Sequence, residues 1–195
     1  MIRDCVIRNN RARGMNIKGD NGTILDNVVD GSSAGGIEVG PEPGWDESGC
    51  SCHLLIAGNL IRHVGYATAY APPLWEAGAV SILGNTGASA VNFGHNGIAV
   101  VGNRFVDDNG INLLITDTRN MLVSGNTFTR SMRSPNNRGA DYHFNTSSLV
   151  WLQQCKNILL AGNRVIDPGA AMKKLVGMGP GVCNVRGTHD GVKIK

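Results

Sequence analysis

The sequence predicts an all-β protein, a right-handed parallel β-helix (solenoid) of about six coils with long loop insertions. Two observations predict this fold class. A short aliphatic phrase around a Gly-Asn pair recurs along the chain, and glycine, at 27 of 195 residues, is about twice as common as usual. The clearest copy reads Leu54-Leu55-Ile56-Ala57-Gly58-Asn59-Leu60-Ile61. Because solenoid repeats bury their core only by stacking on their neighbours, recurring phrases of this kind are typical of solenoids.

The phrase occurs six times, with Asn at one fixed place in five copies and Cys5 at that place in the first. These places are positions 5, 27, 59, 103, 126 and 163. The shortest gap, 22 residues, is too short for a strand-helix-strand unit of roughly 30 residues. It fits one coil, in which two short strands flank a corner of two or three residues. Gly and Asn tolerate the left-handed backbone of such corners, and stacked corners would align the Asn amides in a ladder.

A second family of strands shares one pattern of alternation. Its members are residues 14–18, 36–40, 80–82, 112–116, 149–153 and 183–186. Successive side chains on a strand point to opposite faces. Two columns are therefore predicted to point inward: Met15, Ile37, Val80, Leu113, Val150 and Cys183, and Ile17, Val39, Ile82, Ile115, Leu152 and Val185. The outward file is then Asn16, Glu38, Ser81, Leu114, Trp151 and Asn184.

Three long insertions border this outward file. They cover residues 40–49, 65–78 and 130–148, and each is far longer than a corner requires. Long loops on a rigid scaffold are where function is usually placed. The outward file and the insertions are therefore predicted to form a groove.

Residues 1–195 are expected to form a single parallel β-helix domain. Strand-like Ile2 follows Met1 directly, with no amphipathic helix to cover the first coil. We therefore expect either a fragment of a longer β-helix or solenoid ends that pair with another copy in a homo-oligomer. No run of 18 apolar residues predicts a membrane span. The first residues do not resemble a signal peptide, so a secreted or periplasmic location is expected only if one has been removed.

Composition argues against a metal, another cofactor or nucleic acid. Cys50 and Cys52 adjoin His53, but a Cys-x-Cys-His sequence without a second ligand pair falls short of zinc spacing. Cys5 and Cys183 are expected to be small core residues. The net charge of +3 comes from scattered basic residues, which is not typical of a nucleic-acid-binding surface.

The residues of the insertions suit a carbohydrate. Trp45-Asp46-Glu47 and Trp75-Glu76 each place an indole beside a carboxylate. Sugars stack their C–H faces on indoles and bond their hydroxyls to carboxylates, amides and Arg. Hydrolysis needs two carboxyl groups, about 6.5 to 9.5 Å apart for inversion or about 5 to 5.5 Å for retention. Neighbouring coils are about 4.8 Å apart, so carboxylates on one face can meet either spacing. The available set is Glu38, Asp46, Glu47 and Glu76.

The first 65 residues or so carry a resemblance to a known family. The matching motifs are Arg13-Gly14-Met15, Ile24-Leu25-Asp26-Asn27, Gly36-Ile37-Glu38-Val39, Trp45-Asp46-Glu47-Ser48-Gly49 and Leu55-Ile56-Ala57-Gly58-Asn59. They resemble the β-helix of bacterial inverting α-1,3-galactosidases, of the pectate-lyase-like superfamily. The resemblance implies carboxylate catalysis on an exposed β-helix face, and it brings Glu47 into that role.

The leading hypothesis is a glycoside hydrolase that acts on a terminal sugar of an oligosaccharide or polysaccharide. Glu47 and Glu38 are its expected acid/base pair, with Asp46 as the substitute. The expected substrate contacts are Trp45, Trp75, Glu76, Trp151, Arg13, Asn16 and Lys18. The alternatives are a non-catalytic glycan-binding or tailspike-like structural module and a polysaccharide lyase. In the plainer interpretation Glu38 pairs with a neighbour such as Lys18, Asp46 holds its own loop, and Trp75 covers the coil beneath it.

Overall fold

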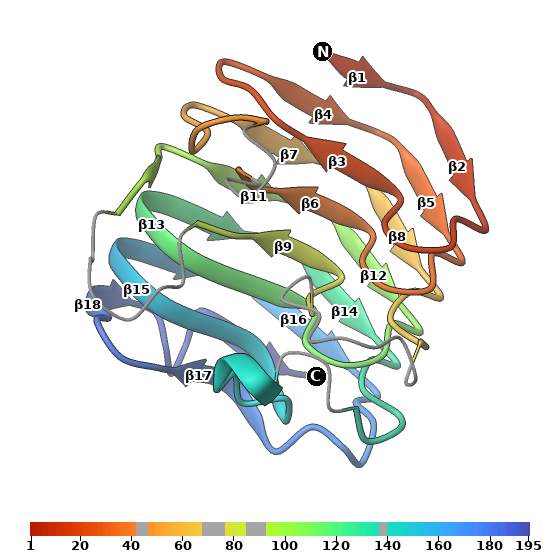
Figure 1. Cartoon of the computed structure of the whole chain (residues 1–195). Helices are drawn as coiled ribbons and strands as arrows, with labels where there is room; N and C mark the ends of the chain where they lie inside the picture. Colours follow the sequence, from red (N-terminus) through yellow and green to blue (C-terminus); the bar gives the residue numbers. More distant parts are fainter. Residues whose placement is uncertain (42–46, 68–76, 85–92, 137–139) are drawn as a thin grey trace.

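The structure, a computed structural model, describes residues 1–41, 47–67, 77–84, 93–136 and 140–195. Within these residues the chain is all-β and nearly without helix, since its one helical element is a 3-10 turn, η2 (Ala140–Tyr142). Every strand pair in these ranges is parallel and belongs to one of two sheets (Figure 1). No helix in this part of the chain is long and apolar enough to cross a membrane.

A twelve-stranded sheet is built from two files of short strands that share two long ones. The first file contains β1 (Ile2–Arg3), β4 (Thr23–Leu25), β7 (Leu55–Ala57) and β11 (Ala99–Val101). The second contains β3 (Met15–Ile17), β6 (Ile37–Val39) and β9 (Val80–Ile82). Both files, and β10 (His95–Asn96), pair with β13 (Leu113–Ser124). β13 in turn pairs with β15 (Ser148–Ala161), and β15 with β17 (Lys174–Met178) and β18 (Cys183–Arg186).

The long strands β13 and β15 serve both files because they bend without breaking. Asp117 and Asn120 in β13 adopt φ angles of 48° and 54°, and Gln154 and Asn157 in β15 adopt 52° and 57°. Asn and Asp reach this left-handed region more readily than other side chains do. Each long strand therefore bends at two positions that are three residues apart. Its pairing with the neighbouring long strand continues on both sides of these bends.

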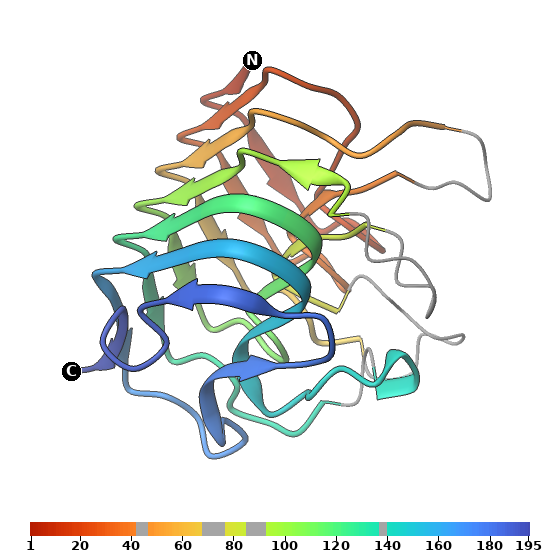
Figure 2. The ribbon, with the colours of Figure 1, turned by 90° about the vertical axis from the view of Figure 1, so that its left-hand side faces the viewer.

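The seven-stranded sheet closes the other side of the molecule (Figure 2). Its strands, in order, are β2 (Val6–Arg8), β5 (Val28–Asp30), β8 (Leu60–Arg62), β12 (Arg104–Val106), β14 (Thr127–Thr129), β16 (Asn163–Ile166) and β19 (Val192–Ile194). Along the sequence, a first-file strand is followed by a strand of this sheet and then by a second-file strand. We call one such pass a tier. The curled, stacked sheets are consistent with a parallel β-helix.

The predicted register of the second file is confirmed from β3 through β15. Met15 pairs with Ile37, Ile37 with Val80, Val80 with Leu113 and Leu113 with Val150. The last member was wrong, because Val150 pairs with Val176 of β17, whereas Val185 of β18 pairs with Ile158 in the first file. A period of two fits either file, so alternation alone could not decide between these two strands.

The core lies between the sheets. Ile37, Val80, Ile115 and Leu152 from the second file are almost fully buried in one cluster with Ile56 and Val100 from the first. From the seven-stranded sheet, Phe105 and Phe128 stack with ring centroids 4.6 Å apart. The predicted inward direction of these columns is therefore confirmed from β3 through β15.

The predicted amide ladder is present and runs through five tiers. In each step one Asn Nδ2 donates to the Oδ1 of the next, from Asn27 to Asn59, Asn103, Asn126 and Asn163, at 2.9 to 3.0 Å. Each acceptor Oδ1 also receives the backbone N–H of the donor residue. The buried amides of this ladder are thus paired, as their desolvation requires. In the first tier the Cys5 backbone N–H donates to Asn27 Oδ1 at 3.0 Å.

Cys5 and Cys183 were wrongly predicted to be core residues, because both are exposed. Cys5 lies in the first tier and Cys183 in the outer strand β18, so neither has a further tier stacked over it. A ladder position buries its side chain only between two neighbouring tiers.

Candidate functional site

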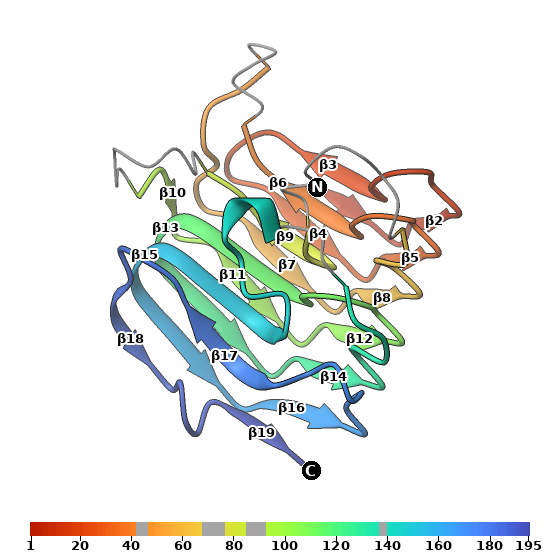
Figure 3. The same ribbon diagram turned by 60° about the horizontal axis from the view of Figure 1, so that its bottom comes forward.

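The outward-pointing residues on the second file of strands are largely covered. Asn16, Glu38, Ser81, Leu114 and Trp151 follow one another in register and lead to Gly177 of β17. Figure 3 shows the strands that carry them, β3, β6, β9, β13, β15 and β17. Asn16 is exposed, but Glu38 and Ser81 are 1% exposed, Leu114 is 0% and Trp151 is 6% exposed. From Glu38 to Trp151 the described outward residues therefore present a packed surface, whereas Asn16 and Lys18 line an open pocket of about 230 Å³.

Glu38 is held by an ion pair with Arg13. The guanidinium Nη1 and Nε of Arg13 both lie 3.0 Å from Glu38 Oε2. Arg13 precedes β3 in the sequence, and Glu38 lies on β6, which pairs with β3. A carboxylate removed from water is stable only with a charged partner and hydrogen bonds, and Arg13 supplies both. The structure therefore brings together a predicted catalytic residue and a predicted substrate-binding residue as an ion pair.

Glu47 is paired in the same way with Lys18, whose Nζ donates to Glu47 Oε2. The Lys18 side chain is 16% exposed and that of Glu47 is 47% exposed. Lys18 follows β3 directly, so Arg13 and Lys18 flank one short strand and each holds one of the two predicted carboxylates. A cation beside a carboxylate favours the ionised form, whereas a general acid must carry a proton.

Trp151 belongs to a second apolar cluster outside the main core. Its other members are Ala77, Leu83, Ile111, Leu114 and Phe144. The indole Nε1 donates to Gln153 Oε1 at 3.3 Å. The ring also lies against Gly177 and Gly179, where an added Cβ would come within 2.7 and 2.8 Å of ring carbons. The partner that an outward Trp requires is therefore the third insertion, through Phe144, together with β17 and the residues after it.

The remaining predicted residues Trp45, Asp46, Trp75 and Glu76 lie outside the described residues.

A pocket of about 260 Å³ opens beside the third insertion. It is lined by Arg133, Pro135, Asn136, Thr146, Ser147, Ala170, Ala171 and Lys173. Lys173 Nζ donates to Ala170 O at 2.8 Å, and Asn136 Nδ2 donates to Gly65 O at 2.9 Å. Arg133 Nη2 reaches Asp167 Oδ2 at 2.5 Å. The pocket thus combines two cations, an amide and hydroxyls with apolar Pro and Ala walls.

The sequence pointed to this insertion, but not to Arg133, Lys173 or Ser147 as members of one pocket. The missed signal is Gly169. A Cβ at this position would overlap Met132 O and Arg133 Cα, so only glycine lets the two segments approach this closely. Such a contact between residues far apart in sequence is invisible to local pattern analysis.

No protein family and no curated protein matches this chain. The resemblance to the galactosidase β-helix thus depends on the motifs quoted above.

The cysteine-rich corner near Cys50 has a structural explanation. Burial, with nearby Asp117 and Cys52, raises the pKa of Cys50 to about 11, so its thiol stays protonated at neutral pH. Fully buried His95 accepts the Ser51 N–H on Nδ1 at 2.9 Å and bonds Leu83 O through Nε2 at 2.8 Å. Both ring nitrogens are therefore used. Among the described residues no group of three or more His, Cys, Asp or Glu side chains is arranged to hold a metal.

Proposed function

We propose that this chain is a right-handed parallel β-helix of six to seven coils that binds a sugar unit of an oligosaccharide or polysaccharide in the pocket beside the third insertion. The winding is supported by the regular passage from first file to seven-stranded sheet to second file, and by the amide ladder that crosses the tiers.

The pocket is the observation that carries the binding proposal. Sugars combine apolar C–H faces with a rim of hydroxyls, and they suit concave sites with apolar walls and a few convergent polar groups. Ala170, Ala171 and Pro135 supply the walls, while Lys173 and Ser147 supply polar groups. At about 260 Å³ the pocket lies just below the usual range of about 300 to 1,000 Å³ for drug-sized ligands, which suits one sugar ring.

Binding without hydrolysis is favoured by the two ion pairs. Arg13 and Lys18 hold Glu38 and Glu47, which occupies the two carboxylates that an inverting mechanism would need. Hydrolysis by Glu47 and Glu38 is a second candidate function. It is favoured by their placement around one strand, β3, on the side of the molecule that bears the first insertion.

The binding proposal is tested with a glycan array, followed by calorimetric titration of the best ligands. Lys173→Ala should weaken binding about tenfold or more, since a hydrogen bond from a charged group is worth about 1.5 to 3 kcal/mol. Lys174→Ala is the matched control, because Lys174 is also exposed but does not line the pocket, and it should bind like the wild type. Absence of binding to every glycan, or equal binding by Lys173→Ala, would contradict the proposal.

The same ligands, assayed for released sugar, separate the two candidates. Turnover that is lost in Glu47→Gln, in a variant that still folds, would select the hydrolase. Binding without turnover selects the binding module.

A further inference from the structure

Between β4 and β15 the outer surface of the first file of strands is mostly apolar and is uncovered in the single chain, and Arg3 of β1 and Arg186 of β18 border it. Two outward columns alternate with the buried residues Ile24, Ile56, Val100, Val123 and Leu160. The columns are Thr23, Leu55, Ala99, Leu122 and Leu159, and Leu25, Ala57, Val101, Ser124 and Ala161. We call these ten residues the leucine face. None is buried, and Leu55 and Leu122 are 37% and 36% exposed.

The leucine face differs from the outer surface of the seven-stranded sheet. There the outward residues include Arg62 beside Asp30, and Arg104, Arg164 and Lys193 in one register. The leucine face carries no charge across its five strands. A contiguous uncharged surface bordered by charges is a candidate interaction site.

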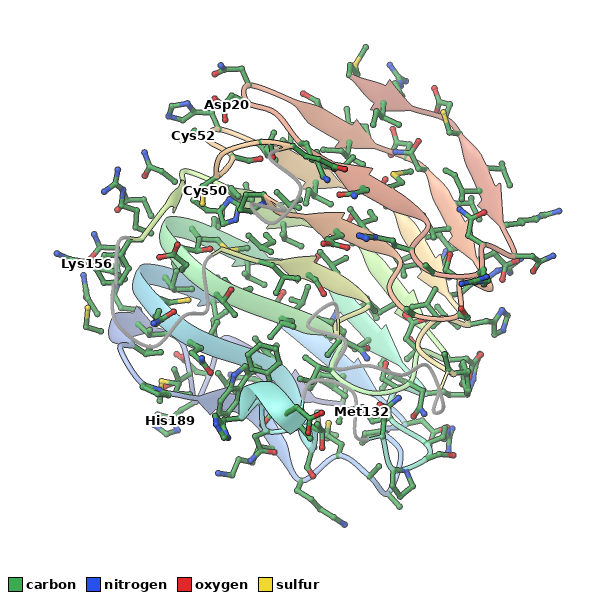
Figure 4. The ribbon with its side chains drawn as sticks, viewed as in Figure 1. Asp20, Cys50, Cys52, Met132, Lys156 and His189 are labelled. Atoms are coloured by element: carbon green, nitrogen blue, oxygen red, sulfur yellow. The ribbon has the colours of Figure 1, made fainter. Side chains whose placement is uncertain are left out.

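The charges along one edge of the leucine face change sign from end to end. Asp20 precedes β4, and its Oδ1 accepts the N–H of Cys52 at 2.6 Å. In the backbone pairing of the strands, Cys52 forms a β-bridge with Asn96. Asn96 lies opposite Arg119, and Arg119 lies opposite Lys156. One edge thus runs from an exposed carboxylate to two exposed cations, with neutral residues between them. Figure 4 shows Asp20, Cys52 and Lys156 along this edge.

We propose that the leucine face binds the leucine face of a second copy of this chain, with the tiers of the two copies running in opposite directions. The two-fold axis lies along the strands at the level of β11. Leu55 then faces Leu122 of the second copy, Ala99 faces Ala99, and Thr23 faces Leu159. The same operation places Asp20 opposite Lys156 and Cys52 opposite Arg119. An isologous pair makes each of these contacts twice, except the contact of Ala99 with Ala99 on the axis, which it makes once.

The charges select this arrangement over the other face-to-face dimer. In that other dimer the two-fold axis would run parallel to the direction in which the tiers stack. Each tier would then face the same tier of the second copy, and the edge with Asp20 would face the opposite edge of the leucine face. That edge carries Asp26 at the same tier as Asp20, so two carboxylates would meet, and Lys156 would meet the uncharged Gly162. Facing like charges cost affinity, whereas complementary edges fix the register.

The contact area limits the strength of the dimer. Five strands at about 4.8 Å and three residues at about 3.3 Å give a face of roughly 20 by 10 Å, before its edges are counted. A standard interface buries about 800 Å² on each partner, so this interface belongs to the small, transient class. The dimer is therefore expected to be weak, and its test must extend to high protein concentration.

Sedimentation equilibrium from about 10 μM to about 1 mM tests the proposal. The wild-type chain should show reversible dimerisation. Leu55→Lys and Leu122→Asp should each weaken it about tenfold or more, because each variant sets a charge against a leucine. The double variant should recover dimerisation, since the introduced lysine of each copy then faces the introduced aspartate of the other.

Leu60→Lys is the matched control, because Leu60 points outward from the seven-stranded sheet in the same tier as Leu55, and it should dimerise like the wild type. Far-ultraviolet circular dichroism confirms folding of each variant. A wild-type chain that stays monomeric throughout, single variants that dimerise normally, or a double variant without recovery would each overturn the proposed dimer. Glycan binding in the pocket, which lies on other elements, is measured separately, so the two proposals fail independently.

Discussion

His95 shows how burial sets the chemistry of a single residue. Burial lowers the pKa of His95 below its ordinary value of 6.5, although its bonds to Leu83 and Ser51 and the nearby carboxylates of Asp117 and Asp20 oppose the shift. Below pH 6.5 the unfolded chain therefore binds a proton that the folded chain resists, and stability is lost as the pH falls toward the folded value.

The expected result is a free energy of unfolding that decreases from about pH 6.5 downward, measured by urea titration at several pH values. His95→Gln should flatten this part of the profile while lowering stability at neutral pH, because a buried bond is lost. His189→Gln replaces an exposed histidine and should keep the wild-type slope. An unchanged slope in His95→Gln would exclude the buried ring as its source.

At the scale of one element, Gly177 of β17 leaves room for the side chain of Trp151. An added Cβ at Gly177 would overlap Ser148 Oγ and lie 2.7 Å from Trp151 Cε3. Gly177→Ala should therefore destabilise the fold by about 1 to 3 kcal/mol through overpacking, as measured by urea unfolding. Gly19→Ala meets nothing within 4 Å and should change stability by less than about 0.5 kcal/mol. Equal effects of the two substitutions would disprove this role for Gly177.

The elements also show which parts of the fold the sequence could predict. β3, β6, β9, β13 and β15 were predicted in correct register, because their alternation and the repeated Asn positions reinforce each other. The assignment failed at Val185, since β17 and β18 have the same period and only pairing with β15 separates them.

At the scale of the whole molecule, the inner amide ladder joins the tiers. Asn103 Nδ2 donates to Ile56 O and Asn126 Oδ1. Asn103 Oδ1 accepts the backbone N–H of Asn59 and a hydrogen bond from Asn59 Nδ2. Asn103→Ala leaves several of these buried groups unpaired and should cost about 2 to 5 kcal/mol of unfolding free energy in a urea titration.

A second row of hydrogen-bonded amides, formed by Asn96, Asn120 and Asn157, provides the matched control. Asn120 bonds Asn96 at 2.8 Å and Asn157 at 2.9 Å, but it is exposed, so water can replace these bonds. Asn120→Ala should therefore cost about 1 kcal/mol or less. If both substitutions destabilised the chain equally, burial would not be what makes the inner ladder important.

The candidate site was less predictable than the fold, because its contacts join distant insertions. The outward direction of Glu38 and Trp151 followed from alternation, but their coverage did not: Arg13 lies 25 residues from Glu38, and Phe144 comes from an insertion without a repeat pattern. The pocket depends on Gly169 meeting the backbone of Met132 and Arg133, a contact that no periodicity encodes.

Because β13 and β15 bend without breaking, we expect the molecule to be stiffer at these strands than at the short ones. From β1 to β11 each corner of the twelve-stranded sheet separates short strands, so one face can loosen while its neighbour stays intact. Between β13 and β15 the backbone bonds continue around the corner, and parting them on one side strains the other. We therefore expect this pair of strands to hold the second file of strands and the leucine face in a fixed position relative to each other.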